Sequence, residues 1–368
     1  MDKPRVPYVN LAGQSRPIRA ELLEAVAQVI DGGDFILGKA VGEFECKFAG
    51  LCGTKYAIGV ANGTDALVMA FKALNIGAGD EVITTSNSFL ATAASISLVG
   101  AKPVFVDVRE DYNIDPALIE RAITKNTKAI LPVHLTGKPA DMQPIMEIAR
   151  KKKLHVIEDA AQAVGAEYRG KKVGSFGIIN CFSLHPLKNL NASGDAGVMT
   201  TDDEKLADTL RKMRNHGLKN RDESEFFAYN SRLDSIQAAL LNVRFNHLKK
   251  WTEARRANAK FYRERLKDVV WCPSDAPHEK QVFHTFVIQA ERRDELQKFL
   301  LEKGVETKIH YPMPIHLMQA AKYLGYKLGD LPVTERLAER ILSLPIYPEL
   351  TAEQKELVVT TIRKFYRK

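Results

Sequence analysis

A lysine at position 188 stands in a segment that could make it a nucleophile. The apolar run 181–184 ends in a Pro-containing turn that carries Lys188, and the Gly-containing stretch 191–199 returns to an apolar run. Apolar flanks favour a dry pocket, in which the pKa of a lysine falls and its amine can form a Schiff base. A solvated loop lysine is the alternative. Ser183 and His185 could instead indicate a serine hydrolase, but no G-x-S-x-G pattern surrounds Ser183.

Two further polar clusters follow short apolar runs. Gly63 and Thr64 lie in ANGTDAL (61–67), where a predicted strand turns into a predicted helix. Backbone N–H groups at a helix N-terminus suit a phosphate, although a simple Asn/Thr cap is equally consistent with the pattern. Asp159 lies in IEDAAQA (157–163), where its carboxylate would either face a ligand above a sheet or cap a helix.

Short apolar runs alternate with amphipathic stretches between residues 56 and 201, which predicts parallel βαβ units. The helix of this region is clearest at 65–74, and 91–100 continues the alternation. Because ligands of such sheets bind at the carboxyl ends of the strands, the polar clusters are expected to converge there. The predicted strands are 56–61, 81–85, 102–108, 129–135 and 154–160.

The remainder of the chain is more helical and predicts a second, smaller domain. Residues 235–266 have apolar positions at helical spacing and a charged outer face, typical of one long helix that could connect two domains. We expect a large α/β domain over 1–249 and a smaller α+β domain over 250–368. The elements predicted in the smaller domain are a strand at 282–290, a helix at 291–304, a strand at 305–311 and a helix at 351–368.

Composition is that of a soluble globular protein. Of the 368 residues 45% are hydrophobic and 27% are charged, with 53 Lys and Arg against 45 Asp and Glu. The net charge of +8 favours anionic partners, and phosphorylated small molecules satisfy it without nucleic acid. We expect a cytoplasmic protein with neither signal peptide nor membrane span, and the spacing of its four cysteines indicates reduced thiols and no metal site.

Four motifs together resemble one family. NGTDAL (62–67), EDAAQAVGA (158–166), FSLHPLKNL (182–190) and GDAGV (194–198) are similar in order and spacing to the DegT-type (DegT/DnrJ/StrS) sugar aminotransferases. The resemblance extends over nearly the whole chain and implies the aspartate-aminotransferase fold, with a mainly parallel sheet and pyridoxal 5′-phosphate as cofactor. Further segments that carry it are 35–49, 229–241 and 308–317.

The resemblance implies roles around the cofactor ring. Lys188 matches the Schiff-base lysine, which would move the proton between the substrate and the cofactor as pyridoxamine phosphate forms. Asp159 matches the carboxylate that pairs with the pyridinium nitrogen. Gln162 matches the residue beside the ring hydroxyl, and Phe89 would stack on the ring face.

The resemblance also implies a phosphate site and a shared active site. Gly63, Thr64 and Ser183 match residues that bind the cofactor phosphate. Asn230 matches a phosphate contact supplied by a second copy of the chain. A homodimer with shared active sites is therefore expected.

Substrate contacts implied by the resemblance are less fully defined by the motifs. His310, Tyr311 and His316 match the substrate-domain motif. Lys219 and Arg221 are candidates for a nucleotide diphosphate, or else they form a solvated helix end. The last candidate is His284, which is either a substrate contact or a strand residue.

Two departures from the family pattern bear on the reaction. Many relatives have Gly where Ala196 stands, and we expect that change to be harmless. The dehydratase branch has His in place of the Schiff-base lysine, so Lys188 favours transamination. The KNL…GDAGV form resembles that of members acting at C3 of the sugar more than that of members acting at C4, which implies amination at C3.

The predicted reaction is transfer of an amino group from glutamate, or glutamine, to a nucleotide-linked ketosugar. Aminosugars of this kind serve surface polysaccharide, lipopolysaccharide or secondary-metabolite synthesis. The alternatives are a non-catalytic regulatory protein of the same fold and another reaction on the same cofactor, such as a lyase.

Overall fold

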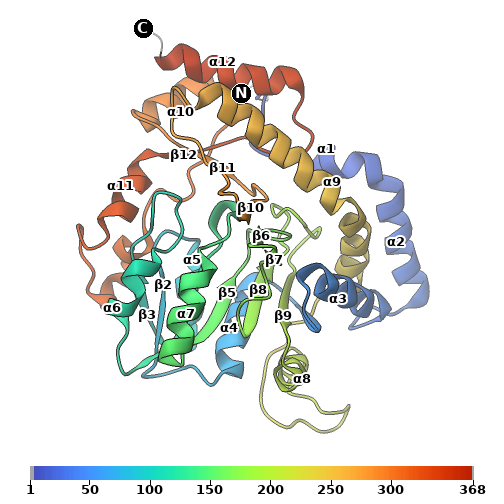
Figure 1. Cartoon of the computed structure of the whole chain (residues 1–368). Helices are drawn as coiled ribbons and strands as arrows, with labels where there is room; N and C mark the ends of the chain where they lie inside the picture. The colour runs from blue at the N-terminus through green and yellow to red at the C-terminus, as the bar shows by residue number, and fades with distance from the viewer. Residues whose placement is uncertain (1–3, 367–368) are drawn as a thin grey trace.

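The computed structural model describes residues 4–366, and within that range a seven-stranded sheet forms the centre of the molecule (Figure 1). Its strands are β1 (Tyr56–Val60), β2 (Glu81–Thr85), β3 (Lys102–Val106), β4 (Thr127–Ile130), β5 (His155–Asp159), β8 (Ile179–Ser183) and β9 (Gly197–Thr201). The order is β1-β9-β8-β5-β4-β2-β3. β9 runs antiparallel to β1 and β8, and the other neighbouring pairs of this sheet are parallel. The predicted α/β class with a mainly parallel sheet is confirmed.

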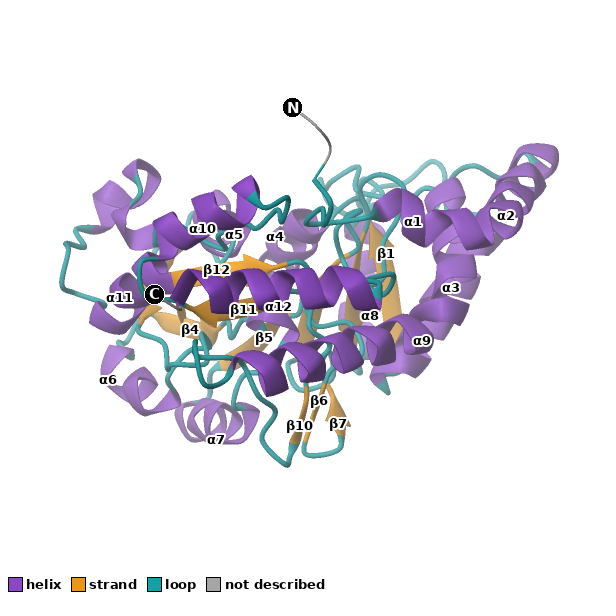
Figure 2. Cartoon of the chain, turned by 90° about the horizontal axis from the view of Figure 1, so that it is seen from above, coloured by secondary structure: helices purple, strands orange, loops and turns teal. Residues whose placement is uncertain are grey.

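Helices cover both faces of the sheet, as Figures 1 and 2 show. Neighbouring strand residues point to opposite faces. Ile58 and Ile157 pack in the same cluster as residues of α4, α5 and α8, whereas Ala57 packs with α3 and Val156 with α7. The helices are α1 (Leu11–Ser15), α2 (Arg19–Gly32), α3 (Lys39–Cys52), α4 (Gly63–Ala73), α5 (Leu90–Leu98), α6 (Ile119–Ala122), α7 (Met142–Lys152), α8 (Glu204–Met213), α9 (Ser235–Leu266), α10 (Arg293–Glu302), α11 (Pro332–Arg340) and α12 (Ala352–Tyr366).

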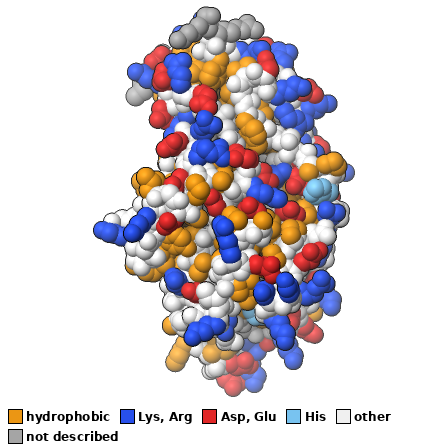
Figure 3. Space-filling view, turned by 60° about the vertical axis from the view of Figure 1, so that its left-hand side comes forward, with side chains coloured by type: hydrophobic (Ala, Val, Ile, Leu, Met, Phe, Trp, Pro, Cys, Tyr) orange, Lys and Arg blue, Asp and Glu red, His pale blue; other side chains and the backbone are white. Residues whose placement is uncertain are grey.

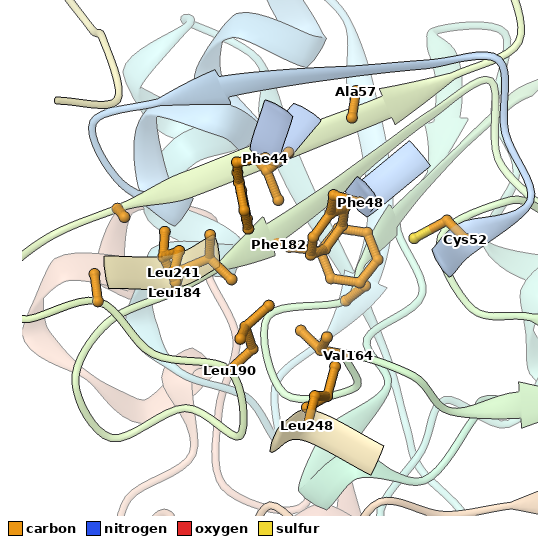
Figure 4. Close-up of a cluster of buried hydrophobic side chains, with 14 of the residues drawn as sticks. Phe44, Phe48, Cys52, Ala57, Val164, Phe182, Leu184, Leu190, Leu241 and Leu248 are labelled. Atoms are coloured by element: carbon orange, nitrogen blue, oxygen red, sulfur yellow. The ribbon is translucent and has the colours of Figure 1, made fainter. Parts of the chain in front are cut away.

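One hydrophobic cluster fixes the segment that carries Lys188 (Figure 4). The rings of Phe48 and Phe182 pack edge to face at 4.9 Å, which ties α3 to β8. Leu184 and Leu190 are both fully buried in this cluster. The turn between them is therefore anchored on both sides, and Lys188 lies within it.

The C-terminal part contains a second, two-stranded sheet of β11 (Phe286–Gln289) and β12 (Ile341–Leu344). It packs with α10, α12 and the end of α9, which runs from beside α2 and α3 to α12 (Figure 1). The N-terminal segment joins this part, because Val6 forms a bridge with Val305. The proposed boundary at 249/250 lies inside α9, and the division into two domains stays a prediction.

Most predicted elements are present. The strands and helices expected between 56 and 108, the strand at 154–160, the long helix and the helix at 291–304 are confirmed, although the strand predicted at 102–108 ends at Val106. The strand predicted at 305–311 is wrong: this segment forms only isolated bridges, from Val305 to Val6 and from Lys308 to Ser343. The closing helix is present as α12, and residues 367–368 of its predicted range lie outside the described residues.

The surface in Figure 3 mixes charges of both signs. Lys and Arg side chains are interspersed with Asp and Glu on the face shown. The excess of basic residues is therefore not gathered into one stripe on the face that Figure 3 shows.

None of the helices within residues 4–366 is long and apolar enough to cross a membrane.

A candidate cofactor site at the strand ends

The N-terminus of α4 presents free backbone donors. Asn62 caps the helix, because its side chain accepts from the N–H of Asp65 at 2.8 Å and its carbonyl accepts from Ala66. Within the described chain the N–H groups of Gly63 and Thr64 have no acceptor, so they are available to an anion. A Cβ on Gly63 would lie 2.8 Å from the Cβ of Ser183, which brings Ser183 against this helix end.

Asp159 is the last residue of β5, and its buried carboxylate is the end of a short hydrogen-bonded chain that includes two hydroxyl groups. Its Oδ2 accepts from Thr92 Oγ1 at 2.7 Å, and Thr92 is bonded in turn to Ser88 at 2.7 Å. Burial raises the pKa of Asp159, whereas the hydrogen bonds from Thr92 and from the N–H of Ala161 lower it. The chain after Asp159 forms turns, so this residue does not cap a helix.

Lys188 lies near enough to Asp159 for the charges of the two side chains to interact. Its backbone N–H donates to the carbonyl of His185 at 2.8 Å within the anchored turn. Burial lowers the pKa of Lys188 to about 8, and the nearby Asp159 carboxylate partly opposes that shift. A substantial fraction of the amine is therefore neutral near physiological pH, as a nucleophile or proton acceptor requires.

The side chains of Gln162, Tyr311 and Phe89 lie close to one another, and Tyr311 is near Asp159. Gln162 is buried, accepts from the N–H of Thr136 at 2.7 Å, and donates to the Tyr311 hydroxyl at 3.4 Å. The Tyr311 ring lies 5.9 Å from the ring of Phe89. Phe89 remains 57% exposed, which is unusual for a phenylalanine and leaves its ring face free to stack.

His284 and His310 join the group from the C-terminal part. Burial and the charge of Lys188 lower the pKa of His310 to about 4 and that of His284 well below its usual range, so both rings are neutral at pH 7. His310 Nδ1 lies 2.9 Å from Ser343 Oγ. Both histidines line a cavity whose wall includes Lys188.

His316 is not part of this group in the structure. It is buried, with one ring nitrogen 2.7 Å from Ser86 Oγ and the other 3.0 Å from Glu335. Both nitrogens are thus engaged within the chain, which leaves neither for a substrate. The geometry assigns His316 to the packing of the segment after β2.

Lys219, Arg221 and Asn230 are exposed on the segment between α8 and α9, which extends beyond α8 in Figure 1. The Nζ atom of Lys219 lies 3.8 Å from Oε2 of Glu223 on the same segment. The residue after Asn230 is better fixed: Ser231 donates to Asp65 at 2.6 Å and accepts from the N–H of Ala61. The base of the segment between α8 and α9 therefore lies beside the N-terminus of α4. The contacts made by the tip of the segment stay a prediction.

These residues fit pyridoxal phosphate. The helix end at Gly63 has unused donors for a phosphate, Asp159 is a buried acid for a ring nitrogen, and Lys188 carries an amine of lowered pKa. The fold and this site define a pyridoxal-phosphate enzyme.

The chain belongs to the DegT/DnrJ/EryC1/StrS aminotransferase family, whose profile matches residues 16–363. The predicted family, its cofactor and its transaminase activity are confirmed at this level. 

Three relatives illustrate the family's range. A protein named pleiotropic regulatory protein, from Geobacillus stearothermophilus, is 47% identical over 367 residues, which cover 98% of this chain and 99% of that protein. A UDP-N-acetyl-3-dehydro-alpha-D-glucosamine 3-aminotransferase from Acidithiobacillus ferrooxidans is 45% identical, with coverage of 98% and 97%. The crystal structure of DesV from S. venezuelae, in complex with a ketimine intermediate, has a TM-score of 0.97 at 42% identity and covers both chains fully.

Sequence reasoning missed some residues of the site. Thr92 lies one helical turn after Phe89, and that spacing is a signal that could have identified it. Arg255 and Glu349 line the cavity beside Lys188 but belong to no motif. Ser231 was likewise not singled out, although its neighbour Asn230 was.

Proposed function

We propose that this chain transfers the amino group of glutamate to C3 of a nucleoside-diphosphate-linked ketosugar. The observation that carries the proposal is Lys188, whose amine has a lowered pKa and interacts electrostatically with the buried acid Asp159. The name of the Acidithiobacillus relative, a 3-aminotransferase, supports amination at C3. Glutamine is the second candidate donor.

The chain's own residues have distinct tasks in this reaction. When bound, pyridoxal phosphate would carry the amino group between substrates and withdraw electrons from the carbon whose proton moves. The Lys188 amine takes that proton and returns it. The Asp159 carboxylate keeps the ring nitrogen protonated, and Thr92 orients that carboxylate. Phe89 covers one ring face and excludes water from it.

The substrate side of the proposal rests on the C-terminal part and on a second copy of the chain. Neutral His284 and His310, with Tyr311, would contact the sugar. Lys219 and Arg221 would meet the diphosphate.

A homodimer with shared sites would bring Asn230 to a partner's cofactor phosphate. Phe227, three residues before Asn230, is fully exposed, and Phe226 and Tyr229 beside it are also exposed. A group of exposed aromatic residues on one segment supports a buried contact in an assembly.

The reaction is tested with purified protein, glutamate and a panel of nucleotide ketosugars. Glutamate should bleach the cofactor absorbance near the visible edge, and one ketosugar should yield an amine identified by mass spectrometry, with NMR locating it at C3. Lys188→Ala should abolish both changes, whereas Lys47→Ala, at an exposed lysine, should not. A product aminated at C4 would contradict the proposed C3 position. Turnover by Lys188→Ala would refute the proposed role of the lysine.

The shared site has a separate test. Lys188→Ala and Asn230→Ala chains are each expected to be impaired, and a mixed dimer would contain one site with both residues intact. Regained activity on mixing supports the cross-subunit role. A mixture no more active than its components would place Asn230 in its own chain's site.

A regulatory protein without turnover is the second candidate, because the Geobacillus relative carries a regulatory name. Purified protein that lacks bound cofactor and does not respond to added pyridoxal phosphate would favour this candidate. A lyase would release products from an amino acid without requiring a ketosugar.

A further inference from the structure

A buried loop, residues 134–140, connects the end of β4 with the start of α7. Every residue of this loop is buried. A buried loop must find partners for its backbone polar groups within the protein. Asn113 supplies some of them, because its Oδ1 accepts from the N–H of Leu135 at 3.0 Å. Its Nδ2 donates to the carbonyls of Lys138 and Pro139 at 3.2 Å and 3.1 Å.

His134 and Glu158 hold the two ends of the loop together. His134 Nδ1 accepts from the backbone N–H of Ala140 at 3.0 Å, so the proton of the neutral ring lies on Nε2. That Nε2–H donates to Glu158 Oε2 at 2.8 Å, and both side chains are fully buried. Burial acts to raise the pKa of Glu158, but hydrogen bonds from His134 and from backbone N–H groups outweigh it and lower that pKa. Glu158 is therefore an ionised acceptor that anchors the His134 ring.

The loop directs one backbone N–H at Gln162. The N–H of Thr136 donates to Gln162 Oε1 at 2.7 Å. Thr136 has a φ of 62°, a left-handed conformation that a β-branched residue rarely adopts, so the contacts of the loop must hold it there. Because Oε1 is engaged, the NH2 group of Gln162 points away from the loop, and its Nε2 lies 3.4 Å from the hydroxyl of Tyr311. Tyr311 is near Asp159, so Gln162 offers a hydrogen-bond donor on the side of that carboxylate.

We infer that His134 and Glu158 are positioning residues, which hold the loop 134–140 so that Gln162 turns its NH2 group toward the cofactor ring. The inference rests on the proposed function, with the ring hydroxyl beside Gln162 as the family resemblance implies. Glu158 precedes Asp159 in β5, and neighbouring side chains of a strand point to opposite faces, so the pair acts through the loop. A donor at the ring hydroxyl stabilises the ionised form of that group and lowers its pKa.

The spectrum of the bound cofactor tests the role of His134. The visible absorbance of the holoenzyme is followed without substrate between about pH 5 and 10. His134→Leu removes both ring bonds, and the pH midpoint of the spectral change should rise by about one unit, as expected for a weakened hydrogen bond to a charged group. Gln162→Leu should raise the midpoint as well, and the double variant should raise it no further than Gln162→Leu alone, because both act on one contact. His134→Gln keeps a donor for Glu158, so its midpoint should lie between those of the wild type and His134→Leu.

Asn180→Ala is the matched control. Asn180 is fully buried on β8, and like Glu158 it is bonded to the backbone of Gly174. Its Nδ2 also donates to Thr200, in the place where Glu158 has His134. Asn180→Ala should lower the thermal midpoint as His134→Leu does and leave the spectral midpoint unchanged. Equal spectral midpoints in the wild type and His134→Leu, additive shifts in the double variant, or the same shift in Asn180→Ala would overturn the inference.

NMR of the unsubstituted protein gives a readout that needs neither turnover nor cofactor. Nitrogen-15 spectra of histidine-labelled apoprotein report which ring nitrogen carries the proton, and the His134 signal is identified by its loss in His134→Gln. A proton on Nδ1 would exclude the bond from Ala140 and overturn the assignment. Where His134→Leu does not fold, His134→Gln decides, and a midpoint equal to that of the wild type would refute the role. If the spectral shift occurs but no ketosugar is aminated, the proposed function fails and the positioning role stands.

Discussion

The reactivity of Lys188 should depend on pH in a way that an ordinary lysine cannot match. Burial lowers its pKa to about 8, with Asp159 opposing the shift. At pH 7 a lysine of that pKa is about 9% neutral, against about 0.03% for one near 10.5, a gain of about 300-fold in the reactive form. The rate at which apoprotein takes up pyridoxal phosphate should follow that neutral fraction.

The assay compares the protein with a model amine. Apoprotein and Nα-acetyl-lysine are mixed with pyridoxal phosphate between pH 6 and 10, and the visible absorbance is followed. The ratio of the two rates cancels ionisation of the cofactor itself. We expect a constant ratio below about pH 8 and a fall above it, because only the model amine continues to deprotonate.

The same assay tests the influence of Asp159. Its negative charge stabilises the Lys188 ammonium and so raises the lysine pKa. Asp159→Asn should therefore move the break in the ratio to lower pH, whereas Asp195→Asn, at an exposed acid in the same region, should not move it. A wild-type ratio that stays constant to pH 10, or a break that rises in Asp159→Asn, would refute the reasoning.

Two further substitutions probe the N-terminus of α4 and the buried carboxylate of Asp159. Gly63→Ala puts a Cβ 2.8 Å from Ser183, and the cofactor dissociation constant should rise about tenfold or more; Gly42→Ala, whose Cβ meets nothing within 4 Å, is the control. Thr92→Val removes the 2.7 Å bond to the Asp159 carboxylate, so the pH at which acidification releases the cofactor should rise by about 1–2 units. An unchanged release pH would show that Thr92 does not tune this acid.

The convergence of the candidate cofactor residues could be predicted because each lies in a short local motif. Gly63 and Lys188 follow β1 and β8, and Asp159 ends β5; a mainly parallel sheet brings such strand ends to one edge. Local pattern failed where tertiary contacts decide. The segment 305–311 alternates like a strand, yet the structure pairs only single residues of it with the N-terminal segment and β12. His316 matched a substrate motif, but its two ring nitrogens are hydrogen-bonded to Ser86 and Glu335.

Arg255 shows why part of the cavity beside Lys188 could not be predicted from the sequence. In the sequence it belongs to the charged face of a long amphipathic helix, and such a face is normally solvated. In the fold the C-terminal part and the chain after β12 close over that turn of α9, so the guanidinium becomes buried and donates to the carbonyl of Ile346. The motifs at the strand ends therefore define the chemistry of Lys188, whereas contacts among distant segments define what can reach it. Relatives can then share the cofactor residues and still differ in their substrates, which is why the identity of the sugar has to come from the ketosugar panel.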